Sequence, residues 1–130
     1  MSINRSKQFF ICAKVYDKRG MLLSVGWNSY SKTHPRQAHW AKVVNRPLAV
    51  YLHAESMAIF RLRPSQQKKA YRIEIARFAE NGEPRIAKPC EICSKIIEAY
   101  GIQEVVYSTD EGFSPISYDE WNLLRVAVAN

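Results

Sequence analysis

The sequence predicts one α/β domain over residues 1–130, in which helices cover both faces of a β-sheet. Three observations support this prediction. Segments that alternate between apolar and polar residues, as strands do, are separated by segments with apolar residues at helical spacing. A chain of 130 residues has the length of a single domain, and 47% hydrophobic residues are enough for one packed core. Strands separated by helices favour a sheet that is covered on both faces.

The first expected element is a hairpin. Residues with high strand propensity alternate in polarity over 9–16 and again over 21–27. The polar residues 17–20 between these segments end in a glycine, which suits a tight turn between antiparallel strands. We therefore expect two strands joined by this turn.

A long polar segment separates the hairpin from the first clear helix. Residues 28–48 have no regular hydrophobic pattern, although a short helix over 37–44 fits them, and loops of this length are often functional. Residues 52–62 combine strong helix formers with apolar positions and end before Pro64, which disfavours continuation of a helix. We expect a mostly buried helix over 52–62.

A strand, a helix and a strand follow. Strict alternation predicts a strand over 71–78, apolar residues at helical spacing predict a helix over 90–100, and a short apolar run predicts a strand over 105–107. This succession favours a right-handed crossover between parallel strands. The tail fits either a helix over 117–128 or a strand over 125–129.

The basic residues are concentrated in the first two thirds of the chain. Residues 1–50 have a formal charge of +8, residues 51–90 of +4 and residues 91–130 of −5, within a total of +7. A basic surface favours polyanionic partners, although a solvated face has the same composition. The sequence has no apolar run of membrane-spanning length and starts without the apolar segment of a secretory signal. We therefore expect a cytoplasmic protein with no membrane partner.

The chain has three cysteines, Cys12, Cys90 and Cys93, which are too few for a disulfide framework. Cys90 and Cys93 form a Cys-x-x-Cys pair, which is typical of either a redox pair or half of a metal site. Cys12 lies in an alternating strand and is expected to be a core residue.

The most specific motif combines His53-Ala54-Glu55, at the start of one expected helix, with Pro89-Cys90-Glu91-Ile92-Cys93, at the start of the next. Cysteines three residues apart share one helical face, so both sulfurs can reach one ion, and a helix N-terminus stabilises their thiolates. One histidine and two cysteines leave one position of a tetrahedral zinc ion open. An open position is typical of a catalytic site, where a water molecule can ionise near neutral pH. Glu55 beside it can act as the general base and acid.

Two other interpretations of these residues stay open. A structural zinc site needs a fourth ligand, which His34 or His39 could supply. A redox Cys-x-x-Cys pair would leave His53 and Glu55 without a role.

The combination of His53-Ala54-Glu55 with Pro89-Cys90-Glu91-Ile92-Cys93 resembles the cytidine and deoxycytidylate deaminase superfamily, which includes deaminases of tRNA and of single-stranded DNA and RNA. The resemblance runs from about Phe9 to Tyr107. It implies a three-layer α/β/α fold with a mixed sheet of about five strands sandwiched between helices. It also implies that His53, Cys90 and Cys93 bind Zn²⁺, and that Glu55 transfers protons during the hydrolytic release of ammonia. Members commonly form homo-oligomers, which this chain length permits.

The resemblance also suggests substrate contacts. The family has an asparagine at the position of Asn28, after the second strand, that contacts the substrate, and backbone groups around Ala54 and Lys88 are expected to read the base edge. Asparagine is also a common loop residue after a strand. In the basic segment, Lys32 and His34 are candidates for binding a substrate phosphate, and the aromatic residues Tyr30, Trp40 and Tyr51 are interleaved with the cations.

Three functions are consistent with these residues. The first is deamination of the cytosine base of a nucleotide, as in deoxycytidylate deaminases. The second is deamination of cytosine or adenine in single-stranded DNA or RNA. The third is a non-catalytic zinc-containing domain that binds nucleic acid.

Overall fold

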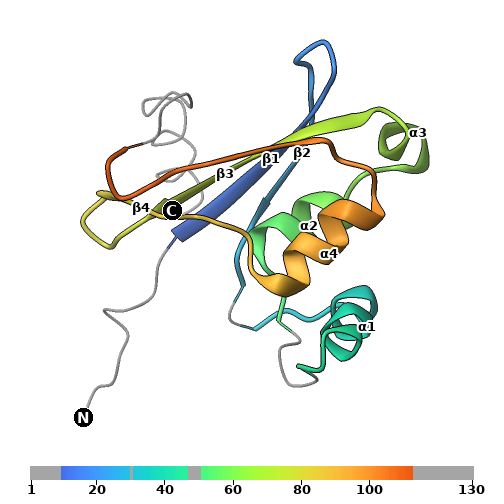
Figure 1. The fold of residues 1–130 in the computed structure, drawn as a ribbon, viewed down its shortest axis with the longest axis horizontal. Coiled ribbons are helices and arrows are strands. Elements are labelled where there is room, and N and C mark those ends of the chain that lie inside the picture. The colour runs from blue at the N-terminus through green and yellow to red at the C-terminus, as the bar shows by residue number, and fades with distance from the viewer. Residues whose placement is uncertain (1–9, 30, 47–50, 113–130) are drawn as a thin grey trace.

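The structure of the chain is a computed structural model that describes residues 10–29, 31–46 and 51–112. Its strands and helices alternate along the chain much as the sequence predicts (Figure 1). In order, the elements are β1 (Phe10–Asp17), β2 (Leu22–Trp27), α1 (Pro35–Val43), α2 (Ala54–Phe60), α3 (Pro64–Gln67), β3 (Ala70–Phe78), β4 (Pro84–Arg85), α4 (Glu91–Ala99) and β5 (Glu104–Tyr107).

The five strands form one mixed sheet, so the predicted α/β fold with a five-stranded sheet is confirmed. β1 pairs antiparallel with β2 on one side and with β3 on the other. The free edge of β3 then pairs with two short strands: antiparallel with β4 near Phe78 and parallel with β5 over 72–75. The parallel pairing of β3 and β5 across α4 agrees with the expected strand–helix–strand crossover.

The hairpin between β1 and β2 is closed by the turn that the sequence predicts. The Asp17 carboxylate accepts hydrogen bonds from the backbone N–H groups of Arg19 and Met21, each at 2.9 Å. Gly20 follows with a φ of 89°, a left-handed conformation that glycine adopts without steric cost. This turn lies at the end of the sheet opposite to Phe10, where β1 begins.

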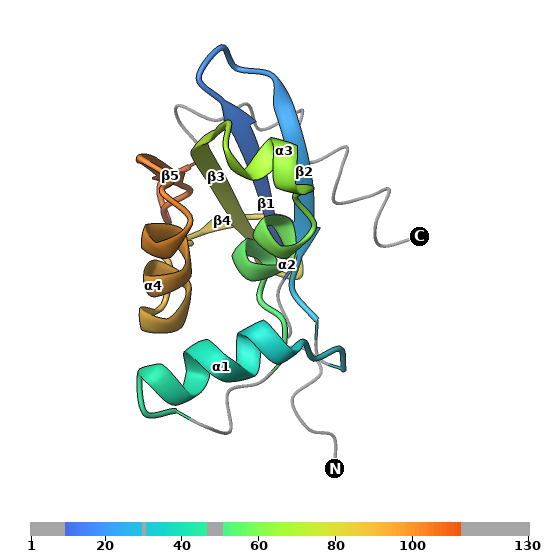
Figure 2. The same cartoon turned by 90° about the vertical axis from the view of Figure 1, so that its right-hand side faces the viewer.

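The main core lies between one face of the sheet and the helices α2 and α4, which are side by side in both views (Figures 1 and 2). The alternation in β1 and β3 places Ala13, Val15, Ile73 and Ile75 on this face, all without solvent exposure. From the helices, the fully buried residues are Ala54, Ala58, Ile59, Ile92 and Ile96. A second, smaller cluster, Cys12, Ala76 and Phe78, uses the intervening residues and therefore occupies the other face.

Helix α2 contacts β2 closely because Gly26 has no side chain. A Cβ at Gly26 would overlap the backbone nitrogen of Ala58 and lie 2.5 Å from the backbone oxygen of Ala54. Ser24, two residues earlier, donates a hydrogen bond of 2.7 Å to the carbonyl of Ala58. These contacts fix α2 against the strand that ends just before Asn28.

The structure differs from the sequence prediction mainly at short elements and at helix ends. The helix expected over 52–62 begins at Ala54, with His53 as its N-cap, and the helix expected over 90–100 begins at Glu91, with Cys90 as its N-cap. The short helix expected over 37–44 spans Pro35–Val43. The sequence does not predict the four-residue α3 and the two-residue β4, because neither is long enough for a hydrophobic pattern to repeat. The tail over 117–128 lies outside the described residues.

None of the helices in the described part of the chain is long and apolar enough to cross a membrane.

Candidate metal centre and active site

The candidate site forms where the N-termini of α2 and α4 meet. His53 is the N-cap of α2; its backbone N–H donates a 3.0 Å hydrogen bond to the Ser56 hydroxyl, which in turn donates to the His53 carbonyl at 3.1 Å. Cys90 is the N-cap of α4, and its sulfur accepts a hydrogen bond from the backbone N–H of Cys93. Both caps have the extended backbone that is usual for an N-cap residue.

The imidazole of His53 and the two thiols lie within reach of one metal ion. His53 Nδ1 is 3.4 Å from Cys90 Sγ and 3.2 Å from Cys93 Sγ, and the three donor atoms all lie within 4.8 Å of one another. In a tetrahedral zinc site with ordinary bond lengths, nitrogen and sulfur ligands are separated by about 3.6 Å. The observed distances are close to this value, so the group fits Zn²⁺.

The environment of the cysteines favours a thiolate at Cys90. The pKa of Cys90 is lowered to about 4, first by a hydrogen bond from the Cys93 side chain, and further by hydrogen bonds with His53 and the backbone N–H of Cys93. The pKa of His53 is raised, chiefly by its hydrogen bond with Cys90. A thiolate is the form of cysteine that binds a metal, so Cys90 is suited to hold an ion. In the metal-free site a hydrogen bond with Cys90, together with burial, raises the pKa of the Cys93 thiol.

Glu55 lies beside the metal-binding group but is not part of it. It is the second residue of α2 and only 6% exposed, and burial raises the pKa of its carboxyl group. Its oxygens are not among the donor atoms that lie within 4.8 Å of one another. A buried carboxyl group with a raised pKa can both accept and return a proton near neutral pH, as a general base and acid must.

His53, Glu55 and Cys90 open onto one cavity of about 460 Å³. Apolar residues from β1, from the segment before α2 and from the segment before α4 line part of it: Ile11, Leu52, Ile86 and Ala87. Polar and basic residues line the rest: Asn28, Ser29, Arg77 and Lys88. An apolar cleft with a few convergent polar groups is the usual form of a small-molecule site. We call this space the catalytic cavity.

Asn28 lines the catalytic cavity, where the family resemblance places a substrate contact. Its side-chain oxygen accepts a 2.9 Å hydrogen bond from the backbone N–H of Ile11, and its own backbone N–H donates to the Ile11 carbonyl at 3.1 Å. These two bonds join the end of β2 to the start of β1. They fix the orientation of the Asn28 amide at the wall of the cavity.

Among the other predicted substrate contacts, Lys88 also lines the cavity, whereas Lys32 and His34 do not. The His34 ring stacks on Phe60 at 4.7 Å, and its Nδ1 accepts a hydrogen bond from the backbone N–H of Arg36 as the N-cap of α1. Lys32 is exposed, and its carbonyl accepts a hydrogen bond from Leu52, the residue before His53. Ala54 is fully buried at the start of α2, between His53 and Glu55.

Arg77 also lines the catalytic cavity, although no sequence motif points to it. Arg77 lies near the end of β3, paired with Ile11 of β1, and so reaches the same cavity wall as Asn28. The alternation of β3 predicts a strand there, but it does not show which residue lies beside the site. Only the pairing of β1 with β3 brings Arg77 to the cavity.

The alternative of a structural site with four protein ligands has no support in the described residues. The donor group found there contains His53, Cys90 and Cys93 and neither of the other histidines. His34 is occupied as a helix cap, and His39 lies edge-on to the Trp40 ring at 5.2 Å. Cys12 is buried on the other face of the sheet, as the sequence predicts for a core residue.

Comparison with known families agrees with this geometry. Residues 2–109 match the cytidine and deoxycytidylate deaminase zinc-binding region. This range includes Glu55 and the three residues of the metal-binding group, His53, Cys90 and Cys93. Comparison with curated proteins gives no match. Since the match covers most of the chain, and the histidine and cysteines that it contains form a group that fits Zn²⁺, the chain belongs to the cytidine and deoxycytidylate deaminase family.

Proposed function

We propose that the protein is a zinc-dependent hydrolytic deaminase that acts on the cytosine base of a nucleotide and releases ammonia. One observation supports this most: the metal-binding group, the buried Glu55 and the amide of Asn28 all meet at a single cavity with basic residues in its wall. In the reaction, water adds to the ring carbon that bears the amino group. A carbon–oxygen bond forms, the carbon–nitrogen bond breaks, and the nitrogen leaves as ammonia.

His53, Cys90 and Cys93 hold the zinc ion in this proposal. When bound, zinc acts as a Lewis acid and lowers the pKa of water at the site. Glu55 takes a proton from the attacking water and delivers it to the departing nitrogen. Burial suits the Glu55 carboxyl group to this role, since its raised pKa allows it to hold the proton between the two steps.

The remaining polar residues of the catalytic cavity position the substrate. Asn28 contacts the sugar or the base, and the backbone around Ala54 and Lys88 reads the base edge. The side chains of Lys88 and Arg77 provide the positive charge for a phosphate of the nucleotide. Lys32 and His34 lie outside the cavity wall, so we assign them to a more distant part of the substrate.

A second candidate is deamination of a base within single-stranded DNA or RNA. It is favoured by exposed cations on α1 and just after it, Arg36, Lys42 and Arg46, beyond what one phosphate requires. Arg46 is close enough to the metal centre for its charge to act on His53. Cytoplasmic location and a homo-oligomeric state stay predictions from the sequence.

The experiment that tests the proposal is a substrate screen with zinc-loaded protein. Ammonia release is measured with cytidine, deoxycytidine, their monophosphates, adenosine monophosphate and oligonucleotides that contain cytosine or adenine. We expect turnover of a cytosine nucleotide, its loss in Glu55→Ala, and its retention in Glu98→Ala, which removes an exposed glutamate from α4. Ammonia release that persists in Glu55→Ala, or none from any of these substrates, would refute the proposal.

A further inference from the structure

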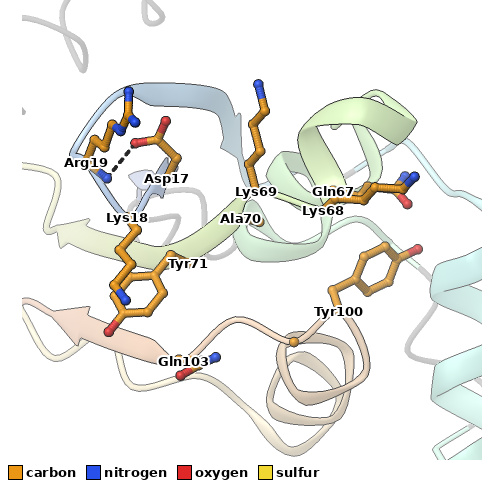
Figure 3. Close-up of a pocket in the computed structure, with 11 residues that line it drawn as sticks. Asp17, Lys18, Arg19, Gln67, Lys68, Lys69, Ala70, Tyr71, Tyr100 and Gln103 are labelled. Carbon is orange, nitrogen blue, oxygen red and sulfur yellow. Dashed lines mark hydrogen bonds between the residues drawn. The ribbon is translucent and has the colours of Figure 1, made fainter.

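A second cavity, larger than the catalytic cavity, lies between the β1–β2 turn, the start of β3 and the end of α4 (Figure 3). Its volume is about 750 Å³. Three separate segments form its walls: the β1–β2 turn at 17–19, the link from α3 to β3 at 67–71, and the end of α4 with the chain after it at 100–103. None of the residues of the zinc motif lines it. We call this space the basic cavity.

The walls of the basic cavity are strongly cationic. Lys18 and Arg19 come from the turn, and Lys68 and Lys69 come from the segment before β3; all four are exposed. The one acidic residue in the wall, Asp17, accepts hydrogen bonds from two backbone N–H groups of its own turn. The cavity therefore offers a positive field to an anion, and its cations are spread along two walls.

Two aromatic side chains also line the basic cavity. Tyr71 is on the side of the turn, where Lys18 Nζ is 5.8 Å from the centre of its ring, and Tyr100 is on the side of α4 (Figure 3). The Tyr100 hydroxyl accepts a 2.8 Å hydrogen bond from Arg36 of α1. Cations interleaved with aromatic rings are the usual surface for a single-stranded nucleic acid, in which phosphates contact the cations and bases stack on the rings.

The basic cavity is too far from the catalytic cavity for one mononucleotide to occupy both. Cys90 at the start of α4 lines one cavity and Tyr100 at its end lines the other, and a helix of this length spans about 15 Å. Along β1, Ile11 lines the catalytic cavity and Asp17 lines the basic cavity, and the backbone between these two residues spans about 20 Å. A nucleic-acid strand extends over such a distance. Two further cations lie near residues of the two cavities. Arg36 of α1 donates a hydrogen bond to Tyr100, and the charge of Arg46, after α1, acts on His53.

We propose that the basic cavity binds the backbone of a single-stranded nucleic acid, with Lys18, Arg19, Lys68 and Lys69 on its phosphates and the Tyr71 and Tyr100 rings against its bases. A small anion is a poorer fit, because a mononucleotide or phosphate site needs one or two cations that converge, and these four are exposed on separate walls. The binding does not depend on deamination. It is therefore independent of the proposed function, although a strand bound here could extend toward the catalytic cavity.

The test is fluorescence anisotropy of a labelled oligothymidylate of about 12 nucleotides, titrated with the zinc-loaded full chain at several salt concentrations. We expect the variant Lys68→Ala/Lys69→Ala to bind at least about tenfold more weakly and to reduce the salt slope by about 1.4, since each lost phosphate contact contributes about 0.7. The matched control, Arg63→Ala/Lys95→Ala, removes the same charge from exposed residues outside this cavity and should keep both values. Equal losses in the two variants would overturn the proposal.

Tyr71 allows a second test with a substitution that does not change the charge. Tyr71→Leu should weaken binding about fivefold or more with an unchanged salt slope, and Tyr71→Phe, which keeps the ring, should restore it. Thermal melting and zinc content, measured for every variant, show that the fold is intact. No binding by the parent chain, or release of the oligonucleotide by inorganic phosphate at equal phosphate concentration and constant ionic strength, would overturn the proposal. Glu55→Ala should still bind the oligonucleotide, so a failure of catalysis is distinguished from a failure of this site.

Discussion

The two cavities of this molecule are built in opposite ways. In the catalytic cavity, His53 and Cys90 cap two helices and Glu55 is buried, so the functional groups are fixed by the same hydrogen bonds and packing that form the core. In the basic cavity, the lysines and the arginine are exposed and belong to a turn and a link between elements. Catalysis requires functional groups that are held in a fixed geometry, whereas attraction of a polyanion requires only that charges of one sign are concentrated on a surface.

The largest expected effect is the loss of the metal ion from the catalytic cavity. Cys90→Ala removes one ligand of the metal-binding group, so bound zinc and ammonia release should both be lost. Cys12→Ala is the control: it changes a cysteine in the smaller core cluster, and this variant should keep one zinc ion per chain. Metal content by mass spectrometry and ammonia assays check both variants. Full zinc occupancy in Cys90→Ala would show that Cys90 is not a metal ligand.

The next largest effect concerns the support of the catalytic cavity. Gly26→Ala should destabilise the fold by about 3 kcal/mol, because the new Cβ would overlap the backbone of α2 and push that helix from β2. Gly101→Ala is the control. A Cβ there meets nothing within 4 Å, so the cost, about 1 kcal/mol, comes only from its φ of +73°. Urea denaturation measures both free energies of unfolding, and equal values would show that close contact of α2 with β2 is unimportant.

A smaller effect tests whether Lys88 in the catalytic cavity contacts the phosphate of the substrate. Lys88→Ala should raise KM for a cytosine mononucleotide about tenfold, the value of one lost contact to a charged group, and should leave KM for the nucleoside unchanged. Lys95→Ala, on the exposed side of α4, is the matched control and should change neither KM. The prediction fails if the two substrates lose affinity equally, since the effect then does not involve the phosphate.

The smallest expected change is the reactivity of Cys12. Burial raises the pKa of the Cys12 thiol to about 12, so at pH 9 it stays protonated and inaccessible in the folded chain. Treatment of the native, zinc-loaded protein with iodoacetamide at pH 9 should therefore leave Cys12 unmodified, and peptide mass spectrometry after unfolding in urea should find it modified. Rapid modification in the native state would show that the face of the sheet with Cys12, Ala76 and Phe78 is open.

The same contrast explains what the sequence could predict. His53, Glu55, Cys90 and Cys93 were identifiable because each pair lies within three residues at a helix start, where local spacing sets the geometry. The hairpin, α2, β3, α4 and β5 follow from hydrophobic periodicity.

The rest depends on contacts between distant segments. Arg77 reaches the catalytic cavity only through the pairing of β3 with β1, and His34, though basic and in the expected loop, caps α1 instead of lining that cavity. The basic cavity joins residues from three parts of the chain, as far apart as Lys18 and Tyr100, so no local pattern could reveal it. The two-residue β4 is too short to show a period.

The most direct test of the account measures zinc content and ammonia release together in Glu55→Gln. This substitution keeps the shape of the side chain and removes its ability to take a proton. If Glu55 transfers protons and is not a ligand, the variant should keep one zinc ion per chain while ammonia release from the cytosine nucleotide falls by a factor of about 100 or more. Loss of zinc together with activity, or retention of both, would contradict the assignment of separate roles to Glu55 and to the three ligands.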